Sequence, residues 1–189
     1  MNIIMTGSTS FVGAATVREL LRRGHTVTAI VRPKSSKLDT ILEGNEEALL
    51  SGRLLVTEND LSEPEKLLEK VTKPQDVFCH FGWGGSGSAS RTDKALQEKN
   101  MEISLETIRT AKALGCKKFL FSGSQAEYGM HQDLITENTV CEPKSLYGEA
   151  KLAMREKGEK LCDELGLRYI HARIFSAYGP GDHPWTLVE

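Results

Sequence analysis

The sequence predicts an α/β fold in which a parallel sheet is doubly wound, with helices on both of its faces. Six apolar runs of strand length alternate with segments whose apolar residues recur at helical spacing. Strands joined through helices pair in parallel, and right-handed crossovers then cover both faces of the sheet. The 189 residues are enough for one such domain with a full hydrophobic core and a fraction of a second.

The first half of the chain contains four of the predicted strands and three of the predicted helices. The first strand ends at Gly7, and the helix after it is expected to stop at Gly24, because glycine favours the residue just past a helix end. The segment Ser62-Glu63-Pro64-Glu65 has the form of a capping box, so we expect it to open a helix. The predicted strands are residues 2–6, 25–31, 53–57 and 76–80, and the predicted helices are 12–23, 38–50 and 62–71.

The second half begins with a segment rich in glycine and serine, residues 82–89, which we predict to be a flexible loop within the domain. Gly115 and Gly166 mark the expected ends of two long helices. The predicted helices are residues 92–114 and 145–165, and the predicted strands are 118–122 and 168–175. Doubly wound folds bind ligands at the carboxyl ends of their strands, so functional residues are expected in the loops that follow the strands.

The composition excludes several functional classes. The net charge is −2, from 24 basic and 26 acidic residues that are evenly mixed, so we expect no nucleic-acid partner. No apolar run approaches the ~20 residues of a membrane helix, and we expect no membrane partner. The first residues lack the basic region and cleavage site of a signal peptide, which predicts a cytoplasmic protein.

The cysteines and histidines do not form a metal-binding pattern. The four cysteines lie far apart without a CxxC pair, so they are expected to be reduced and buried. A zinc site needs clustered ligands, and the five histidines are scattered, so no metal is expected.

A phosphate-binding loop is predicted between the first strand and the first helix, at Thr6-Gly7-Ser8-Thr9-Ser10-Phe11-Val12-Gly13. A turn at this place directs backbone N–H groups and the positive end of a helix toward a diphosphate. Gly7 permits the tight turn and Gly13 lets the helix pack close to the sheet, while Ser10 stands where the common pattern has its middle glycine. The candidate cofactor-binding residues of this loop are Gly7, Ser10, Phe11, Val12 and Gly13.

The end of the second strand bears on the choice between NAD and NADP. An NAD-specific site places an acid there on the ribose 2′-hydroxyl, whereas an arginine accommodates a 2′-phosphate. This sequence has Arg32 at that point, followed by Ser35 and Ser36. It therefore favours NADP over NAD, the alternative being that Arg32 and Lys34 belong to a solvated turn.

The candidate catalytic residues are Ser124, Tyr147 and Lys151. Tyr147 and Lys151 are four residues apart, which puts a phenol and an ammonium on one face of a helix. A nearby ammonium is expected to lower the pKa of the phenol, which suits proton exchange between a carbonyl and an alcohol. Ser124 follows the fifth strand and is expected to donate a hydrogen bond to the reacting oxygen.

With these motifs in this order, the sequence resembles the extended short-chain dehydrogenases/reductases over essentially the whole chain. The resemblance is to their nucleotide-sugar epimerase/dehydratase branch. The motifs that carry the resemblance are 6–13, Asp60-Leu61, His80-Phe81-Gly82, Asn100, 122–129, 147–151 and 173–181. The resemblance implies a Rossmann domain in which Asp60 and Leu61 contact adenine, Phe81 and Gly82 line the cofactor, and Lys151 also binds the nicotinamide ribose. Further candidate cofactor-binding residues are Trp83, Asn100, Ser122 and Tyr147. Trp83 is expected either to stack on substrate or to cover the cofactor pocket.

Departures from the family pattern narrow the expected chemistry. Gln125 and Ala126 stand where dehydratases carry an Asp-Glu pair, and neither can supply the acid or base that elimination of water needs. Glu127, one residue further, is expected to face differently. We therefore favour reduction of a keto-sugar nucleotide with hydride from NADPH and a proton from Tyr147. The alternatives are an epimerase with tightly bound NAD and a non-catalytic regulatory protein that senses NADP(H).

The resemblance also shapes the expected organisation of the protein. We predict a Rossmann domain over residues 1–175 and the start of a truncated substrate-binding part over 176–189, because family members continue well beyond this point. The chain is accordingly expected to bind cofactor and to turn over a nucleotide-sugar substrate poorly. The resemblance further implies a homodimer that is built from the helices at 92–114 and 145–165.

Overall fold

The computed structural model describes residues 1–85 and 88–181. The last eight residues of the predicted substrate-binding part, and two residues of the predicted flexible loop, therefore lie outside the described residues.

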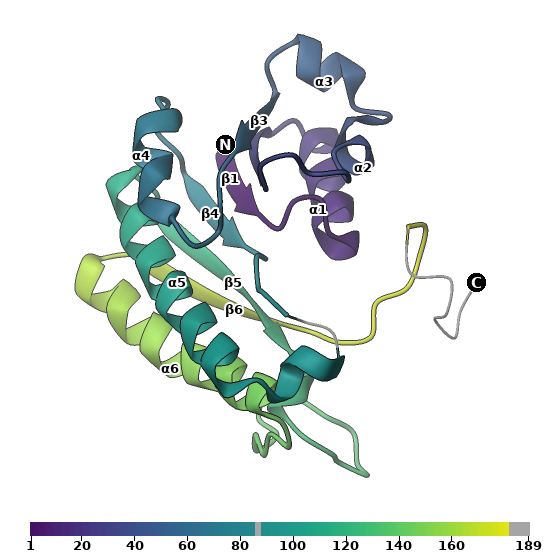
Figure 1. Ribbon diagram of the computed structural model, residues 1–189, viewed down its shortest axis with the longest axis vertical. Coiled ribbons are helices and arrows are strands. Elements are labelled where there is room, and N and C mark those ends of the chain that lie inside the picture. The colour runs from purple at the N-terminus through teal and green to yellow at the C-terminus, as the bar shows by residue number, and fades with distance from the viewer. Residues whose placement is uncertain (86–87, 182–189) are drawn as a thin grey trace.

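One six-stranded sheet, parallel throughout, forms the centre of the fold (Figure 1). The strands have the order β3-β2-β1-β4-β5-β6, so the chain runs outward from β1 to β3 and then crosses back to β4. The carboxyl ends of β1 and β4 thus mark the switch point at which doubly wound sheets bind ligands. The strands are β1 (Asn2–Thr6), β2 (Thr26–Val31), β3 (Leu54–Glu58), β4 (Val77–His80), β5 (Lys118–Ser124) and β6 (Arg168–Ile174).

Helices cover both faces of the sheet, which confirms the predicted doubly wound α/β fold (Figure 1). One face carries α1 (Phe11–Arg22), α2 (Asp39–Leu42) and α3 (Glu46–Leu50). The other carries α4 (Leu67–Lys70), α5 (Lys94–Ala113) and α6 (Leu146–Leu165). Three short 3₁₀ turns, η1 (Pro64–Lys66), η2 (Ser88–Thr92) and η3 (Gln125–Glu127), lie in the connections.

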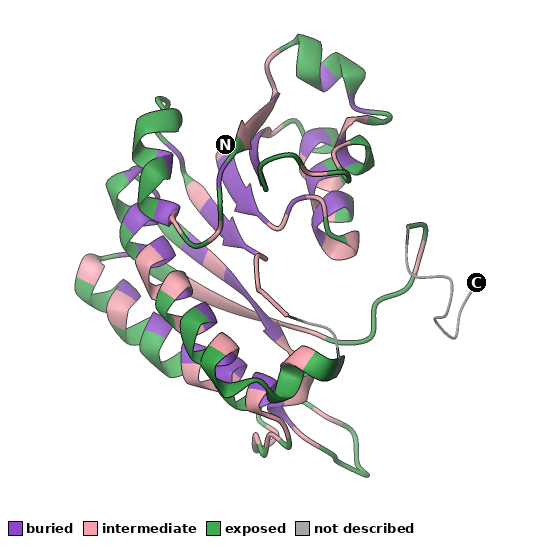
Figure 2. Ribbon diagram, in the orientation of Figure 1, coloured by how far each residue is buried: buried purple, intermediate pink, exposed green. Residues whose placement is uncertain are grey.

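The hydrophobic core is divided by the sheet into two clusters, seen as buried strands between half-buried helices in Figure 2. Successive side chains of a strand point to opposite faces, so Ile4 packs toward α5 while Ile3 and Met5 pack toward α1. In the cluster under α4, α5 and α6, the rings of Phe78 and Phe119 stack with centroids 5.6 Å apart. This aromatic layer fixes the long helices against β4 and β5.

Two predicted helices differ from the observed ones for local reasons. The predicted helix at 38–50 is two short helices, because Gly44 adopts φ +74° and ends the first of them. The predicted capping box at Ser62 does not form. The N–H and the hydroxyl of Ser62 both donate to Asp60 Oδ1, at 2.8 and 2.6 Å, and the helix begins at Pro64 as a 3₁₀ turn.

The described part of the chain contains no helix that is long and apolar enough to cross a membrane. Within the same residues, no group of three or more His, Cys, Asp and Glu side chains is placed to hold a metal ion. The four cysteines are unpaired; Cys79, Cys116 and Cys162 are buried, and Cys141 is half-buried.

Replacement of Phe119 by alanine tests the aromatic layer. Phe119 is fully buried between Phe78 and Tyr169, so Phe119→Ala is expected to lower the free energy of unfolding by about 3–5 kcal/mol. The measurement is chemical denaturation, with Leu50→Ala as control. Leu50 is 89% exposed, and its truncation is expected to change stability by less than about 0.5 kcal/mol. Equal losses in the two variants would contradict this packing.

Candidate functional site

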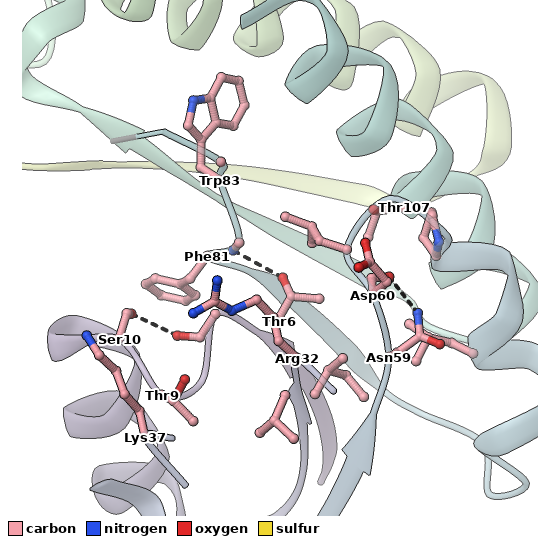
Figure 3. A pocket seen from close by; sticks show the side chains of 18 of the residues that line it. Thr6, Thr9, Ser10, Arg32, Lys37, Asn59, Asp60, Phe81, Trp83 and Thr107 are labelled. Carbon is pink, nitrogen blue, oxygen red and sulfur yellow. Dashed lines mark hydrogen bonds between the residues drawn. The ribbon is translucent and has the colours of Figure 1, made fainter. Parts of the chain in front are cut away.

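A pocket of about 410 Å³ opens at the switch point between β1 and β4 (Figure 3). This size is in the range of small-molecule sites. Eight of the residues predicted to bind a cofactor line it: Gly7, Ser10, Arg32, Asp60, Leu61, Phe81, Gly82 and Trp83. The other lining residues are Thr6, Thr9, Ile30, Val31, Lys37, Asn59, Pro64, Leu67, Gly84, Gly85 and Thr107.

The loop after β1 is packed too closely to admit larger residues at its glycines. Gly7 has φ +68°, and a Cβ there would lie 2.7 Å from the Phe81 carbonyl carbon. Ser10 caps α1: its hydroxyl accepts from the Gly13 N–H at 3.1 Å and donates to the Gly7 carbonyl at 2.8 Å. A Cβ on Gly13 would overlap the Gly7 carbonyl oxygen, so Gly13 serves close packing. The α1 N-terminus, with Phe11 and Val12 in its first turn, thereby points at the pocket.

Polar groups from two strand ends surround the mouth of the pocket. Arg32 and Lys37 are exposed and line it beyond β2. Asp60, beyond β3, accepts two hydrogen bonds from Ser62, and these lower the pKa of its carboxyl. Ser35 and Ser36 are not among the described residues that line the pocket, and the Ser35 hydroxyl accepts from the Lys37 N–H at 3.3 Å.

A chain of hydrogen bonds through His80 holds the loop after β4 in place. Ser104 donates its proton to the Asn100 carbonyl at 2.8 Å, so it accepts from His80 Nε2 at 3.1 Å. His80 Nδ1 then accepts from the Thr6 hydroxyl at 2.9 Å, and Thr6 accepts from the Gly82 N–H at 3.2 Å. Burial of His80 lowers its pKa to about 3, which agrees with this neutral ring.

Two predicted cofactor residues shape the walls around that loop. The Asn100 side chain accepts from the Gly84 N–H at 3.0 Å and donates to the Gly84 carbonyl at 2.8 Å, so it fastens the loop after β4. Leu61 packs so closely that a Cβ on Gly82 would lie 2.7 Å from Leu61 Cδ1. Both contacts favour the small residues found at 82 and 84.

The predicted catalytic residues lie at the carboxyl end of β5 and in the first turns of α6. Ser145 caps α6 by accepting from the Gly148 N–H at 3.1 Å. A Cβ on Gly148 would overlap the Ala126 carbonyl oxygen, so glycine lets α6 pack onto η3 and brings Tyr147 beside Ser124. β5 extends to Ser124, two residues further than predicted, because it pairs with β6 over its whole length.

Lys151 is almost completely buried next to Tyr147. Its Nζ donates to the Ser122 carbonyl at 2.7 Å and lies 4.0 Å from the centre of the Trp83 ring and 4.6 Å from that of Phe121. Both rings present their negative faces to an ammonium. Burial nevertheless lowers the pKa of Lys151 to about 7, against the opposing effect of Glu127. Lys151 therefore gains and loses its proton near neutral pH.

The pKa of Tyr147 is raised, contrary to the sequence-based expectation. Burial of the phenol is the main cause and outweighs Ser124 and Arg91, which act to lower the pKa. Lys151 does not lower it here: its Nζ is bonded to the Ser122 carbonyl and lies 5.7 Å from the centre of the Tyr147 ring. The phenol is thus a protonated group in a dry site.

Trp83 stands between the pocket and the predicted catalytic residues. The described residues that line the pocket include Trp83 but not Ser124, Tyr147 or Lys151. Its ring meets Tyr147 edge-on at 6.3 Å and covers the Lys151 ammonium, while its Nε1 donates to Gln97 Oε1 at 2.9 Å. Figure 3 shows Trp83 at the opposite end of the lining from Lys37.

Several residues that line the pocket were not among the predicted cofactor-binding residues. Thr6 and Asn59 stand at or next to strand ends, so their position was a usable signal. Lys37 and Thr107 gave no such signal, because the folding of the chain after β2 and the packing of α5 bring them to the pocket.

Comparison with known proteins links this geometry to a family. Residues 3–188 match the NAD dependent epimerase/dehydratase family. The chain is 30% identical over 175 residues to the dTDP-6-deoxy-L-talose 4-dehydrogenase (NAD(+)) of Aggregatibacter actinomycetemcomitans, over 90% of this chain and 60% of that protein. It is 29% identical over 178 residues to the D-erythronate dehydrogenase of Cupriavidus necator, over 92% of this chain and 53% of that protein.

A solved structure of similar fold agrees with these sequence matches. The fold matches that of the UDP-glucose 4-epimerase of Thermotoga maritima, determined with UDP-glucose, at a TM-score of 0.81 and 26% identity. The match covers 98% of this chain and 59% of that one. The chain therefore spans between 53% and 60% of the length of these relatives.

Replacement of Lys151 by methionine tests the burial of its charge. The pKa of Lys151 is about 7 in the folded chain, against 10.5 in water, so between these values the unfolded chain binds one more proton. Stability therefore rises with pH across this window, by at most about 1.4 kcal/mol per pH unit. Between pH 6 and pH 9 the wild type is expected to gain stability relative to Lys151→Met in denaturant titrations. A difference that stays constant or shrinks with rising pH would contradict the lowered pKa.

Proposed function

The chain belongs to the NAD dependent epimerase/dehydratase family, and from this membership we propose that it is the cofactor-binding part of an oxidoreductase that acts on a nucleotide-linked sugar. The observation that carries the proposal is that the pocket lies next to the candidate catalytic residues. A pocket with a glycine loop and a helix N-terminus adjoins Ser124, Tyr147 and Lys151 across the single side chain of Trp83.

The residues present fit a dinucleotide. The loop at Gly7 has no space for a side chain, and the first turn of α1 offers N–H groups to a diphosphate. Asp60 and Leu61 would hold the adenosine end, as the family resemblance implies, and Trp83 stands where the pocket meets the candidate catalytic residues. A nicotinamide dinucleotide bound here supplies or accepts the hydride.

The chain itself supplies the proton and the orientation of the reacting group. In the reducing direction the carbonyl carbon gains a hydride, and Tyr147 gives its phenolic proton to the carbonyl oxygen. Ser124 donates a hydrogen bond to that oxygen and so holds it next to the phenol. Lys151 lies one helical turn after Tyr147, and its pKa of about 7 lets it take up and release a proton near neutral pH.

We propose a keto-sugar nucleotide reductase that prefers NADPH. Arg32 and Lys37 both line the pocket beyond β2, where two cations suit a 2′-phosphate. The one carboxylate among the described lining residues, Asp60, already accepts two hydrogen bonds from Ser62. As in the sequence-based interpretation, the substrate-binding part would begin near residue 176.

A 4-epimerase with retained NAD is the second candidate. The likeness to UDP-glucose 4-epimerase favours it, and the family is named for NAD. An NADP(H)-sensing regulatory protein is a candidate of another class, and the presence of Ser124, Tyr147 and Lys151 together weighs against it.

We also propose that α5 and α6, which pack side by side with exposed outer faces, form a homodimer interface (Figure 2).

The nucleotide carried by the purified protein separates the two enzymes. We expect denatured protein to release no dinucleotide by mass spectrometry, and the empty protein to bind NADPH more tightly than NADH. Arg32→Ser is expected to weaken NADPH binding roughly tenfold and to leave NADH binding unchanged, through loss of a charge-assisted contact. Arg22→Ser, which removes an exposed arginine paired with Glu19, is the control and should change neither. Stoichiometric release of NAD would contradict the reductase and support the epimerase.

A further inference from the structure

Glu127 is a fully buried carboxylate directly beneath the candidate catalytic residues. It closes η3, three residues after Ser124. Its Oε1 accepts from the Ser124 backbone N–H at 2.7 Å, while the Ser124 hydroxyl accepts from the Ala126 N–H at 3.2 Å. The two residues form a reciprocal capping box, so the position of the Ser124 backbone depends on the Glu127 carboxylate.

Two side chains of β6 hold this carboxylate from the other side. Arg173 Nε donates to Glu127 Oε2 at 2.8 Å, and His171 Nε2 lies 3.0 Å from both carboxylate oxygens. A Cβ on Gly123 would lie 2.5 Å from His171 Nε2 and 2.6 Å from Glu127 Oε1, so a side chain at this position would displace the His171–Glu127 pair. Charge-assisted bonds of this kind are stronger than neutral ones.

The side chains that hold Glu127 are themselves fixed. Arg173 Nη1 donates to the Tyr128 hydroxyl at 2.9 Å, and the guanidinium lies 4.6 Å from the centre of that ring. His171 Nδ1 meets the Tyr169 hydroxyl at 3.1 Å, and Tyr169 donates to the Met154 carbonyl at 3.0 Å. The network therefore joins α6, β6 and η3 around one carboxylate and leaves it little freedom to move.

The charge of the same carboxylate acts on two titratable groups of α6. Its charge acts to raise the pKa of Lys151 and that of Tyr147. The other groups that face Lys151 are Tyr147 on its own helix and His80 from β4, whose ring is neutral. Arg91 faces Tyr147 from η2 and acts in the opposite direction. Glu127 is the anion that acts on both groups.

We propose that Glu127 is the positioning residue of this site: its buried carboxylate, held by His171 and Arg173, fixes the Ser124 backbone and places a negative charge at the end of β5, which Lys151 binds through the Ser122 carbonyl. The inference rests on the proposed function, since it assigns a role within the same site. Gln125 and Ala126 leave the site without the carboxylates of a dehydratase, and Glu127 does not replace them, because its oxygens are engaged by Ser124, His171 and Arg173.

The titration of Lys151 tests the proposal without any substrate. Protein labelled with ¹³C-lysine is titrated by NMR between pH 5 and pH 9, and the Lys151 signal is identified by its absence from Lys151→Met. In Glu127→Gln the midpoint is expected about one pH unit lower than in the wild type, because the opposite charge is lost. Exchange of the Ser124 amide proton with solvent is expected to be roughly tenfold faster, because its bond to a charged acceptor is lost.

Glu19→Gln is the matched control. Glu19 also accepts from two cationic side chains, Arg22 and Arg23, but it is exposed on α1. Its replacement is expected to leave the Lys151 midpoint and the Ser124 exchange unchanged. An unchanged exchange rate of the Ser124 amide or an unchanged Lys151 midpoint in Glu127→Gln, or an equal change in Glu19→Gln, would overturn the proposal.

A second variant covers the case in which Glu127→Gln does not fold. Glu127→Gln combined with Arg173→Met removes both members of the ion pair and leaves no unpaired arginine inside. Exchange of the Ser124 amide proton is again expected to be faster, because its charged acceptor is lost, and unchanged exchange contradicts the proposal. Failure of the proposed function is detected separately. In that case the proteins titrate as expected but bind neither NADPH nor NAD, or turn over no nucleotide-linked sugar.

Discussion

The hydrogen bond between Thr6 and His80 joins β1 to β4 at the point where the order of the strands reverses. Because the chain turns outward from β1 and returns at β4, the loops after these strands diverge and leave the pocket between them. The buried neutral ring of His80 transmits this constraint, through Ser104, to α5 and the Asn100 carbonyl. The pocket, the loop at Trp83 and α5 are thus joined by one chain of buried hydrogen bonds.

The buried charged side chains of the described residues lie near the end of β5. Lys151 and Glu127 are both buried and both bind the end of β5, Lys151 at the Ser122 carbonyl and Glu127 at the Ser124 N–H. Buried charges are costly unless they are paired, and they recur where a site must hold particular protonation states. Here burial raises the pKa of Tyr147 and lowers that of Lys151 to about 7.

Short-range patterns predicted much of this arrangement, and long-range pairing decided the rest. Short stretches of sequence were enough to place the helix ends at Gly24, Gly115 and Gly166. They were also enough to place the candidate residues at strand ends. The environment of Glu127 does not, because His171 and Arg173 are 44 and 46 residues away in sequence and become its neighbours only through the pairing of β5 with β6. The raised pKa of Tyr147 was missed for the same reason, since burial is a property of the packed fold.

The proposal that Tyr147 is the proton donor is tested by the rate of NADPH oxidation in the presence of a nucleotide-linked 4-keto sugar, compared between the wild type and Tyr147→Phe. The variant is expected to bind NADPH with unchanged affinity and to lose at least about a hundredfold in rate, because the proton donor is gone while the pocket is intact. Equal rates in the two proteins, or a loss of rate that matches a loss of NADPH affinity, would contradict the assignment of Tyr147 as the proton donor beside a separate cofactor pocket.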